Sequence, residues 1–183
     1  MKRLVAFILL LVFPLFALGQ PKINRRVAGF LLGKQYSVTK VQKIIENKYQ
    51  HLSRSFNESN SSLVMAIGSI PFAGEDWECL MVKMESKGKV AEITLGNSFS
   101  TLEDAKSFFL RVSEIIVAKY GKPVINHLED ALECVWEDQV HTQLSLQLNL
   151  NNDPEDSLVC NVWLSYEDEL LVQKIRSDII NEL

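Results

Sequence analysis

Residues 143–150 have the sequence QLSLQLNL, in which leucine alternates strictly with a polar residue. Successive side chains of a β-strand point to opposite faces, so this stretch predicts a strand with one leucine face and one polar face. Such a strand is typical of an antiparallel sheet that is covered on one side only. Residues 157–165 alternate in the same way, and the turn-forming residues 152–156 separate the two stretches. The sequence therefore predicts an antiparallel pair of strands with one face open to water.

Further strands and helices are predicted on both sides of this pair. The other strands are expected near residues 63–70, 76–84, 89–95 and 131–138. Helices, indicated by apolar residues three and four positions apart, are expected at residues 37–49, 101–120 and 167–182. The second helix is the best defined, because Ser100 and Glu103 form a capping box before it and Gly121 follows it.

The predicted elements follow the order α-βββ-α-βββ-α over residues 37–183, which we interpret as a single domain. This order predicts an α+β fold, with an antiparallel sheet and helices packed on one of its faces. Two α-βββ repeats are possible, with halves at 37–98 and 99–183. Residues 20–36 are expected to be a lead-in to the domain. Residues 53–62, SRSFNESNSS, are polar and are expected to form a loop.

The first nineteen residues have the pattern of a secretory signal peptide. Lys2 and Arg3 precede an uncharged apolar run, and the small residues Ala17 and Gly19 mark a cleavage site before Gln20. The run is shorter than the ~20 residues of a membrane-spanning helix. We therefore expect an exported protein, periplasmic or extracellular, with no transmembrane span after cleavage. An uncleaved anchor is the rival interpretation, because basic residues follow the proposed cut.

Composition excludes several classes of protein. The chain has 183 residues and a formal net charge of -4, with 47% hydrophobic and 23% charged residues. This balance is ordinary for a globular protein, and it excludes a disordered chain, a collagen-like fibre and a polytopic membrane protein. Nucleic-acid binders usually carry a strongly basic face, so nucleic acid is not an expected partner.

No catalytic or metal-binding motif is recognisable. His51, His127 and His141 lie far in sequence from one another and from the cysteines, so the short zinc spacings are absent. Residues 151–156 are rich in oxygen ligands but lack the pattern of a helix-loop-helix calcium site, and we interpret them as a turn. The sequence therefore assigns no catalytic residue, no metal and no cofactor, and a non-enzymatic role is favoured.

Three cysteines occur, each within a predicted strand: Cys79, Cys134 and Cys160. An odd number in an exported protein leaves at least one free thiol. Burial as small hydrophobic side chains is the favoured interpretation. One disulfide with one free thiol, and a catalytic cysteine, are the alternatives.

The polar face of the sheet offers a candidate interface. Inward residues should face inward residues, which pairs Leu144 with Leu164 on one side and with Trp136 on the other. The same registers place three residues in one row of the polar face: Val135, Ser145 and Trp163. The residues expected beside them are Val159, Asn161 and Gln147. A large aromatic residue among polar ones is a candidate interface anchor. Alternatively, the N-terminal segment or residues 53–62 cover Trp163. Trp77 is expected in the core with Trp136.

A family resemblance spans most of the chain, as a pattern of elements. The residues that carry it are the stretches 33–49, 72–77 (FAGEDW) and 119–123 (KYGKP). An apolar lead-in containing glycine, a short helix and a β-meander, repeated, resembles small bacterial envelope proteins of the β-lactamase-inhibitor-protein and outer-membrane-assembly-lipoprotein type. Those stretches also resemble uncharacterised small secreted bacterial proteins. The chain lacks the lipidated cysteine of the lipoprotein members, and no functional residue carries over. The resemblance implies a binding role, by analogy.

Three functional hypotheses follow from the sequence. The first is an exported, non-enzymatic binding module whose sheet face binds a protein or another envelope component through Trp163. The second is a carrier of a small ligand, with a pocket between helix 101–120 and the sheet. The third is a hydrolase that uses His127 or His141 with a carboxylate.

Overall fold

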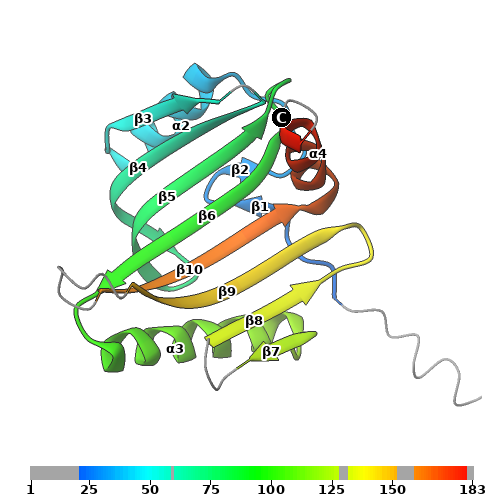
Figure 1. Ribbon diagram of the computed structural model, residues 1–183. Helices are drawn as coiled ribbons and strands as arrows, with labels where there is room; N and C mark the ends of the chain where they lie inside the picture. The colour runs from blue at the N-terminus through cyan, green and yellow to red at the C-terminus, as the bar shows by residue number, and fades with distance from the viewer. Residues whose placement is uncertain (1–20, 59, 128–131, 152–158, 181–183) are drawn as a thin grey trace, which may run out of the picture.

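The computed structural model describes residues 21–58, 60–127, 132–151 and 159–180. Within these residues the chain forms three helices and a large antiparallel sheet, which confirms the predicted α+β class (Figure 1). The proposed signal peptide, residues 1–19, lies outside the described residues, as do most of the 151–156 turn and part of strand 131–138. None of the described helices is long and apolar enough to cross a membrane.

Eight strands form the large sheet. In chain order they are β3 (Ser53–Asn57), β4 (Ser61–Phe72), β5 (Glu75–Glu85), β6 (Val90–Phe99), β7 (Ile125–His127), β8 (Leu132–Glu137), β9 (Thr142–Asn151) and β10 (Val159–Asp168). Their spatial order is β3-β4-β5-β6-β10-β9-β8-β7, and every neighbouring pair is antiparallel. The sheet thus consists of two meanders joined where β6 pairs with β10 (Figure 1).

Two short segments differ from the sequence prediction. Residues 53–57, expected in a loop, form the edge strand β3, in which Phe56 pairs with Leu63 of β4. Most of β3 is exposed, so its side chains show no apolar alternation that would mark a strand. Strand β7, at the other edge, has only three residues, too few for a pattern to be visible.

The N-terminal segment is part of the domain rather than a lead-in to it. Strands β1 (Arg26–Val27) and β2 (Phe30–Leu31) form a small hairpin that buries Ile23, Val27, Phe30 and Leu32 in the main core. Arg25 forms an ion pair with Asp168 at the end of β10. The chain therefore closes over one face of the sheet before its first helix begins.

The helices begin and end close to the predicted positions. They are α2 (Val38–Tyr49), α3 (Leu102–Tyr120) and α4 (Glu169–Ile180). The cap of α3 is one residue later than expected, because the Thr101 hydroxyl, not Ser100, accepts a hydrogen bond from the Asp104 amide at 3.1 Å. Helix α4 also begins two residues late, since Glu167 and Asp168 extend β10.

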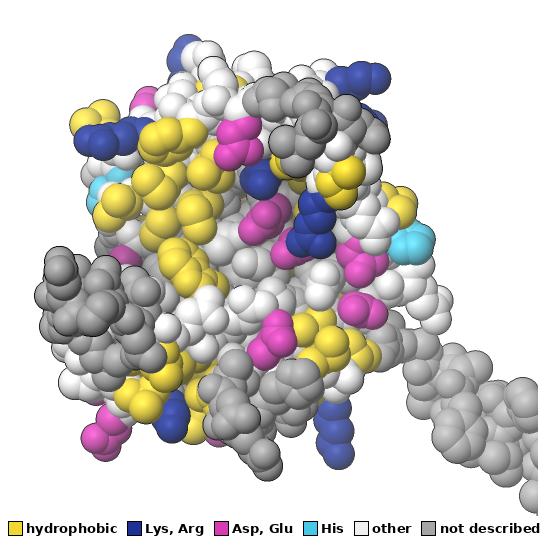
Figure 2. Space-filling view, viewed as in Figure 1, with side chains coloured by type: hydrophobic (Ala, Val, Ile, Leu, Met, Phe, Trp, Pro, Cys, Tyr) yellow, Lys and Arg dark blue, Asp and Glu magenta, His cyan; other side chains and the backbone are white. Residues whose placement is uncertain are grey.

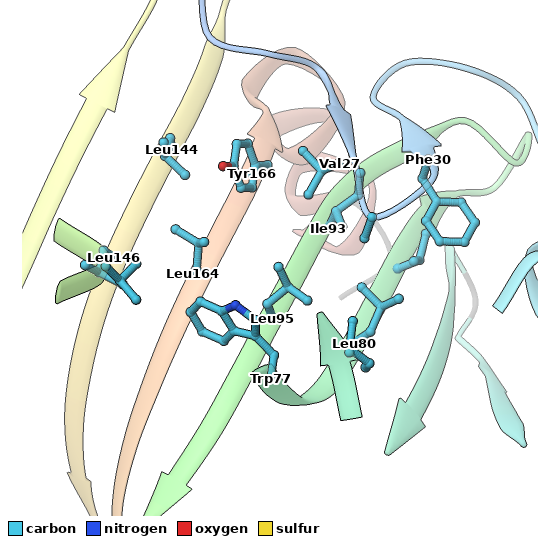
Figure 3. Packing of buried hydrophobic residues seen from close by; sticks show 14 of the residues in the cluster. Val27, Phe30, Trp77, Leu80, Ile93, Leu95, Leu144, Leu146, Leu164 and Tyr166 are labelled. Carbon is cyan, nitrogen blue, oxygen red and sulfur yellow. The ribbon is translucent and has the colours of Figure 1, made fainter. Parts of the chain in front are cut away.

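The main core lies on one face of the sheet, under α2, α3 and the β1–β2 hairpin. Figure 3 shows buried side chains from β5, β6, β9 and β10 meeting Val27 and Phe30 of the N-terminal hairpin. Both Trp77 and Trp136 are buried, as predicted. The expectation that all helices share one face is wrong for α4. In Figure 1 this helix lies in front of the sheet, and it packs on Ala91 in a separate cluster.

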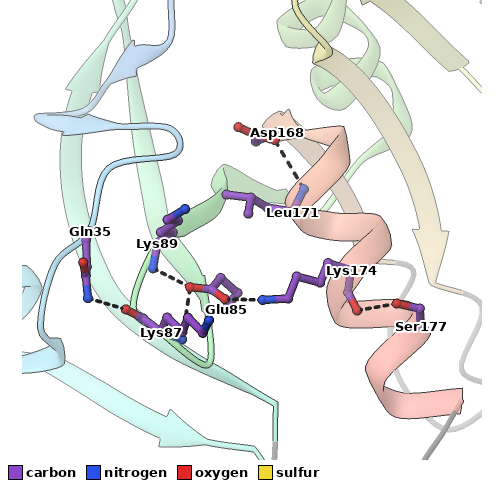
Figure 4. A network of polar contacts seen from close by, with 8 residues as sticks. All are labelled: Gln35, Glu85, Lys87, Lys89, Asp168, Leu171, Lys174 and Ser177. Atoms are coloured by element: carbon purple, nitrogen blue, oxygen red, sulfur yellow. Dashed lines mark hydrogen bonds and ion pairs between the residues drawn. The ribbon is translucent and has the colours of Figure 1, made fainter.

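A buried carboxylate fixes α4 to the turn between β5 and β6. Glu85 accepts hydrogen bonds from the backbone amides of Lys87 and Lys89, at 3.0 and 3.2 Å, and from the Lys174 ammonium at 2.8 Å (Figure 4). Burial alone would raise the pKa of Glu85, but these hydrogen bonds and the Lys174 charge outweigh it and lower the pKa. A charged carboxylate with three hydrogen bonds therefore joins α4 to this turn of the sheet.

Candidate interface on the open face of the sheet

We call the face of the large sheet opposite the main core the open face; α4 covers one end of it. Cross-strand pairing arranges its side chains in rows. One row contains Phe56, Leu63, Lys83, Glu92, Glu167, Gln143 and Glu137. The next contains Arg54, Met65, Met81, Thr94, Ser165, Ser145 and Val135. A third contains Ile67, Cys79, Gly96, Trp163, Gln147 and Glu133.

Apolar side chains occupy the half of the open face that β3, β4 and β5 form. We define the apolar patch as Phe56, Leu63, Met65, Ile67, Cys79, Met81 and Trp163. Ile67 is 69% exposed and Phe56 is 47% exposed, whereas the other members are half-buried. Figure 2 shows hydrophobic side chains gathered over β4 and β5 on this face. A contiguous exposed apolar surface of this kind marks interaction sites in soluble proteins.

Trp163 lies at the inner border of the apolar patch. It is half-buried, and a Cβ atom placed on Gly96 of the neighbouring strand would overlap its six-membered ring. The six-membered ring of Trp163 therefore lies close to the backbone at Gly96, where a side chain would overlap it. The β1–β2 hairpin packs on the other face and residues 53–57 form the edge strand, so the described residues of these two segments do not cover Trp163 as the alternative interpretation required.

The predicted register between β8 and β9 is confirmed, since Trp136 pairs with Leu144 and Val135 with Ser145. The predicted register between β9 and β10 was wrong by two residues. Leu164 pairs with Leu146, and Leu144 pairs with Tyr166. Trp163 consequently faces Gln147 rather than Ser145. A shift of two residues leaves every side chain on its predicted face, so apolar matching could not distinguish the two registers.

The other predicted interface residues are placed differently from one another. Val159, Asn161 and Gln147 are half-buried on the open face. Val135 and Ser145 are on the same face but are buried, with 2% and 9% exposure. These last two are therefore not accessible to a partner on this surface.

The half of the open face around β6, β10 and β9 is polar, and its side chains bond to one another. Ser98 donates to Asn161 at 2.8 Å, and the Thr94 and Ser165 hydroxyls are 3.0 Å apart. Gln147 donates to Glu133 at 2.6 Å. Satisfied polar groups gain little from a new partner, so the apolar half is the better binding surface.

Sequence reasoning missed most of the apolar patch, although a signal for it was present. Residues 63–67 (LVMAI) and 79–82 (CLMV) are apolar without alternation. A continuous apolar run predicts a strand that is apolar on both faces. Faces were assigned only to strands 131–138, 143–150 and 157–165, so the side chains of these runs that point away from the core were not recognised as a surface.

Two carboxylates are cross-strand neighbours at the border between the apolar patch and the polar half of the open face. Glu92 and Glu167 are directly opposite one another on β6 and β10. Burial raises the pKa of Glu167, and the charge of Glu92 raises it further, while Arg176 and Lys83 lower it. This border therefore favours the approach of an additional positive charge.

The described residues support none of the catalytic alternatives. His141 Nδ1 is 3.7 Å from the Glu169 carboxylate, but His141 is exposed on the turn before β9, and the half-buried Glu169 is the first residue of α4. The side chain of His127 is outside the described part of the chain. Burial raises the pKa of the Cys79 thiol, which is the opposite of what activates a nucleophile. The described residues contain no group of three or more potential metal ligands.

A separate cavity of about 310 Å³ lies on the covered side, between β1, α3 and β10. This is where the small-ligand hypothesis expected a pocket. Most of its walls are apolar.

Comparisons with protein-family models, with curated proteins and with solved structures gave no match.

Proposed function

We propose that the protein is an exported, non-enzymatic binding module that takes a segment of a partner protein on the apolar patch. The observation that carries this proposal is the exposure of Ile67 and Phe56 beside half-buried methionines, on a sheet whose other face already packs against the main core. These side chains contribute little to the core, so folding does not account for them. Export rests on the sequence pattern of residues 1–19.

The chemistry of the patch indicates the kind of segment it would bind. Met65 and Met81 lie next to one another and are flexible and polarisable, which suits an adaptable apolar contact. Trp163 provides a large, flat anchor at the border. The Glu92–Glu167 pair lies on the same face, beyond the Thr94–Ser165 row, and would accept a lysine or arginine. The proposed partner segment is therefore amphipathic, with apolar side chains and at least one basic residue.

The test compares two substitutions of the same kind on opposite faces. Ile67→Asp places a charge in the patch, and Leu110→Asp places one on the outer side of α3, where Leu110 is 53% exposed. Both mature variants are used as baits in native envelope extract, beside wild type and Trp163→Ala, after circular dichroism shows that they fold. A stoichiometric partner should be retained by Leu110→Asp and lost by Ile67→Asp and Trp163→Ala.

Two results would contradict the proposal. A partner that all four baits retain would show that binding uses another surface. A wild-type protein that sediments as a dimer, with Ile67→Asp monomeric, would show that the patch is covered by a second copy of the chain instead of a different protein.

A further inference from the structure

The cavity between β1, α3 and β10 has walls of two kinds. Its interior is formed by Val27, Phe72, Ile116, Leu164 and Tyr166. Of these, all but Phe72 are fully buried, and Phe72 meets the Tyr166 ring edge-on, with ring centroids 6.1 Å apart. A preformed concave site with apolar walls and a few polar groups is typical of small-molecule binding.

The polar groups of this cavity are cationic or neutral donors. Arg26 from β1 and Lys119 from α3 both line it and are exposed, which places them at its mouth. No carboxylate is among the described residues that line it, although the whole chain has a net charge of -4. Within the described part of the chain, neither Arg26 nor Lys119 forms an ion pair. Among the described residues, the mouth therefore has a local positive charge and no lining carboxylate, although Lys119 Nζ lies 5.1 Å from the centre of the Tyr120 ring.

Two tyrosine hydroxyls complete the polar part of the site. The Tyr120 hydroxyl accepts a hydrogen bond from the Asn24 amide at 3.2 Å, which leaves its own proton to donate. Burial, with a smaller effect of Tyr120, strongly raises the pKa of Tyr166, so its hydroxyl stays protonated. Both phenols are thus neutral donors beside an apolar chamber.

From this arrangement we propose that the cavity binds a small anionic amphiphile, with its apolar body against Phe72 and Leu164 and its negative head between Arg26 and Lys119. The volume of about 310 Å³ holds about ten groups of water size at about 30 Å³ each, which matches a medium-chain carboxylate such as octanoate. The larger hollow of about 510 Å³ near Tyr36 is lined mainly by polar loop residues and lacks such walls. The cavity is on the opposite side of the sheet from the open face, so a ligand bound there would not need the apolar patch.

Four probes separate the contributions of head and body. Octanoate, octanol and octylammonium share one chain and differ in charge, whereas acetate has the carboxylate without the chain. In calorimetric titrations of the mature protein, octanoate should bind about tenfold more tightly than octanol, as expected for one charge-assisted hydrogen bond. Octylammonium and acetate should show no binding. Equal affinity for octanoate and octanol, or no binding of octanoate, would overturn the proposal.

Variants locate the site. Arg26→Gln/Lys119→Gln should reduce octanoate affinity to that of octanol and leave octanol binding unchanged. Lys43→Gln/Lys106→Gln removes the same charge from exposed positions outside the cavity and should change neither. Ile115→Trp, at a rim position that is 40% exposed, should block both ligands. Octanoate binding that is equal in the two double variants, or that survives Ile115→Trp, would assign the ligand to another place and overturn this site.

Discussion

The two faces of the sheet use the same strands in different ways. On the covered face, one row across five strands consists of Val64, Val82, Ile93, Tyr166 and Leu144, all buried. One residue further along β4, the open face has the row Met65, Met81, Thr94, Ser165 and Ser145. The first row is apolar throughout, whereas the second changes from apolar to polar at β6.

This difference separates what folding requires from what it does not. Burial in the core explains the apolar residues of the first row, since each buried side chain stabilises the fold by about 1.5–3 kcal/mol. The half-exposed methionines of the second row gain only part of this, and serines or threonines would serve a solvated face as well. The apolar patch therefore needs an explanation outside the stability of the monomer, and partner binding provides one.

The largest expected effect is a loss of unfolding free energy, and it appears when one tryptophan from each face is replaced by alanine. Trp77 is fully buried, donates to the Phe72 carbonyl at 3.1 Å and packs edge-on against Phe108. Trp77→Ala should lower the free energy of unfolding by about 3–5 kcal/mol. Trp163→Ala should cost about 1 kcal/mol, because the ring is half-exposed. Urea denaturation at neutral pH measures both, and equal losses would show that the open face is a second core.

The sequence was enough to predict which side chains share a face of the sheet, but not which residues of β9 and β10 pair with one another. Alternation in residues 143–150 correctly separated the leucines from the polar side chains, because a strand has a period of two. It could not decide whether Leu144 faces Leu164 or Tyr166, since both partners are apolar and lie on one face. The position of Trp163 opposite Gln147 therefore required the structure.

The limits of prediction were similar for the candidate sites. Strand β3 carries Phe56 into the apolar patch, yet its sequence is polar enough to resemble a loop. The cavity depends on Arg26 and Leu164, which are far apart in sequence and are brought together only because the N-terminal hairpin folds over β10. A single sequence contains no local signal for contacts between residues that are so far apart in the chain.

A smaller effect is expected at Gly96, where the Trp163 ring lies close to the backbone of the neighbouring strand. Gly96→Ala adds a Cβ atom that would overlap the Trp163 ring, and it should cost about 1–3 kcal/mol in unfolding free energy. In a Trp163→Ala background the cost should vanish, because alanine is tolerated better than glycine inside a strand. A double-mutant cycle measures this coupling. The same cost in both backgrounds would mean that the ring does not rest on Gly96.

The smallest effect concerns the charges at the border of the patch. Like charges directly opposite on neighbouring strands destabilise a sheet, so Glu167→Gln should raise the free energy of unfolding by about 0.2–1 kcal/mol at pH 7. The folded-state pKa of Glu167 lies above its ordinary value of 4.5. The native protein therefore loses stability as pH rises from 4.5 through that higher pKa. The gain from Glu167→Gln should grow over the same window and be absent in acid.

Glu85 provides a control with the opposite sign. Its folded-state pKa is lowered from 4.5, so its contribution is present above 4.5 and is lost as pH falls through the lower value. Glu85→Gln should therefore destabilise the protein at pH 7, with a difference that shrinks in acid. Chemical denaturation of both variants from pH 3 to pH 7 tests the two slopes. If Glu167→Gln brings no gain at pH 7, Lys83 and Arg176 already neutralise the pair, and the border has no need of a basic partner residue. A gain accompanied by weaker capture of the partner would instead show that the repulsion is retained because binding relieves it.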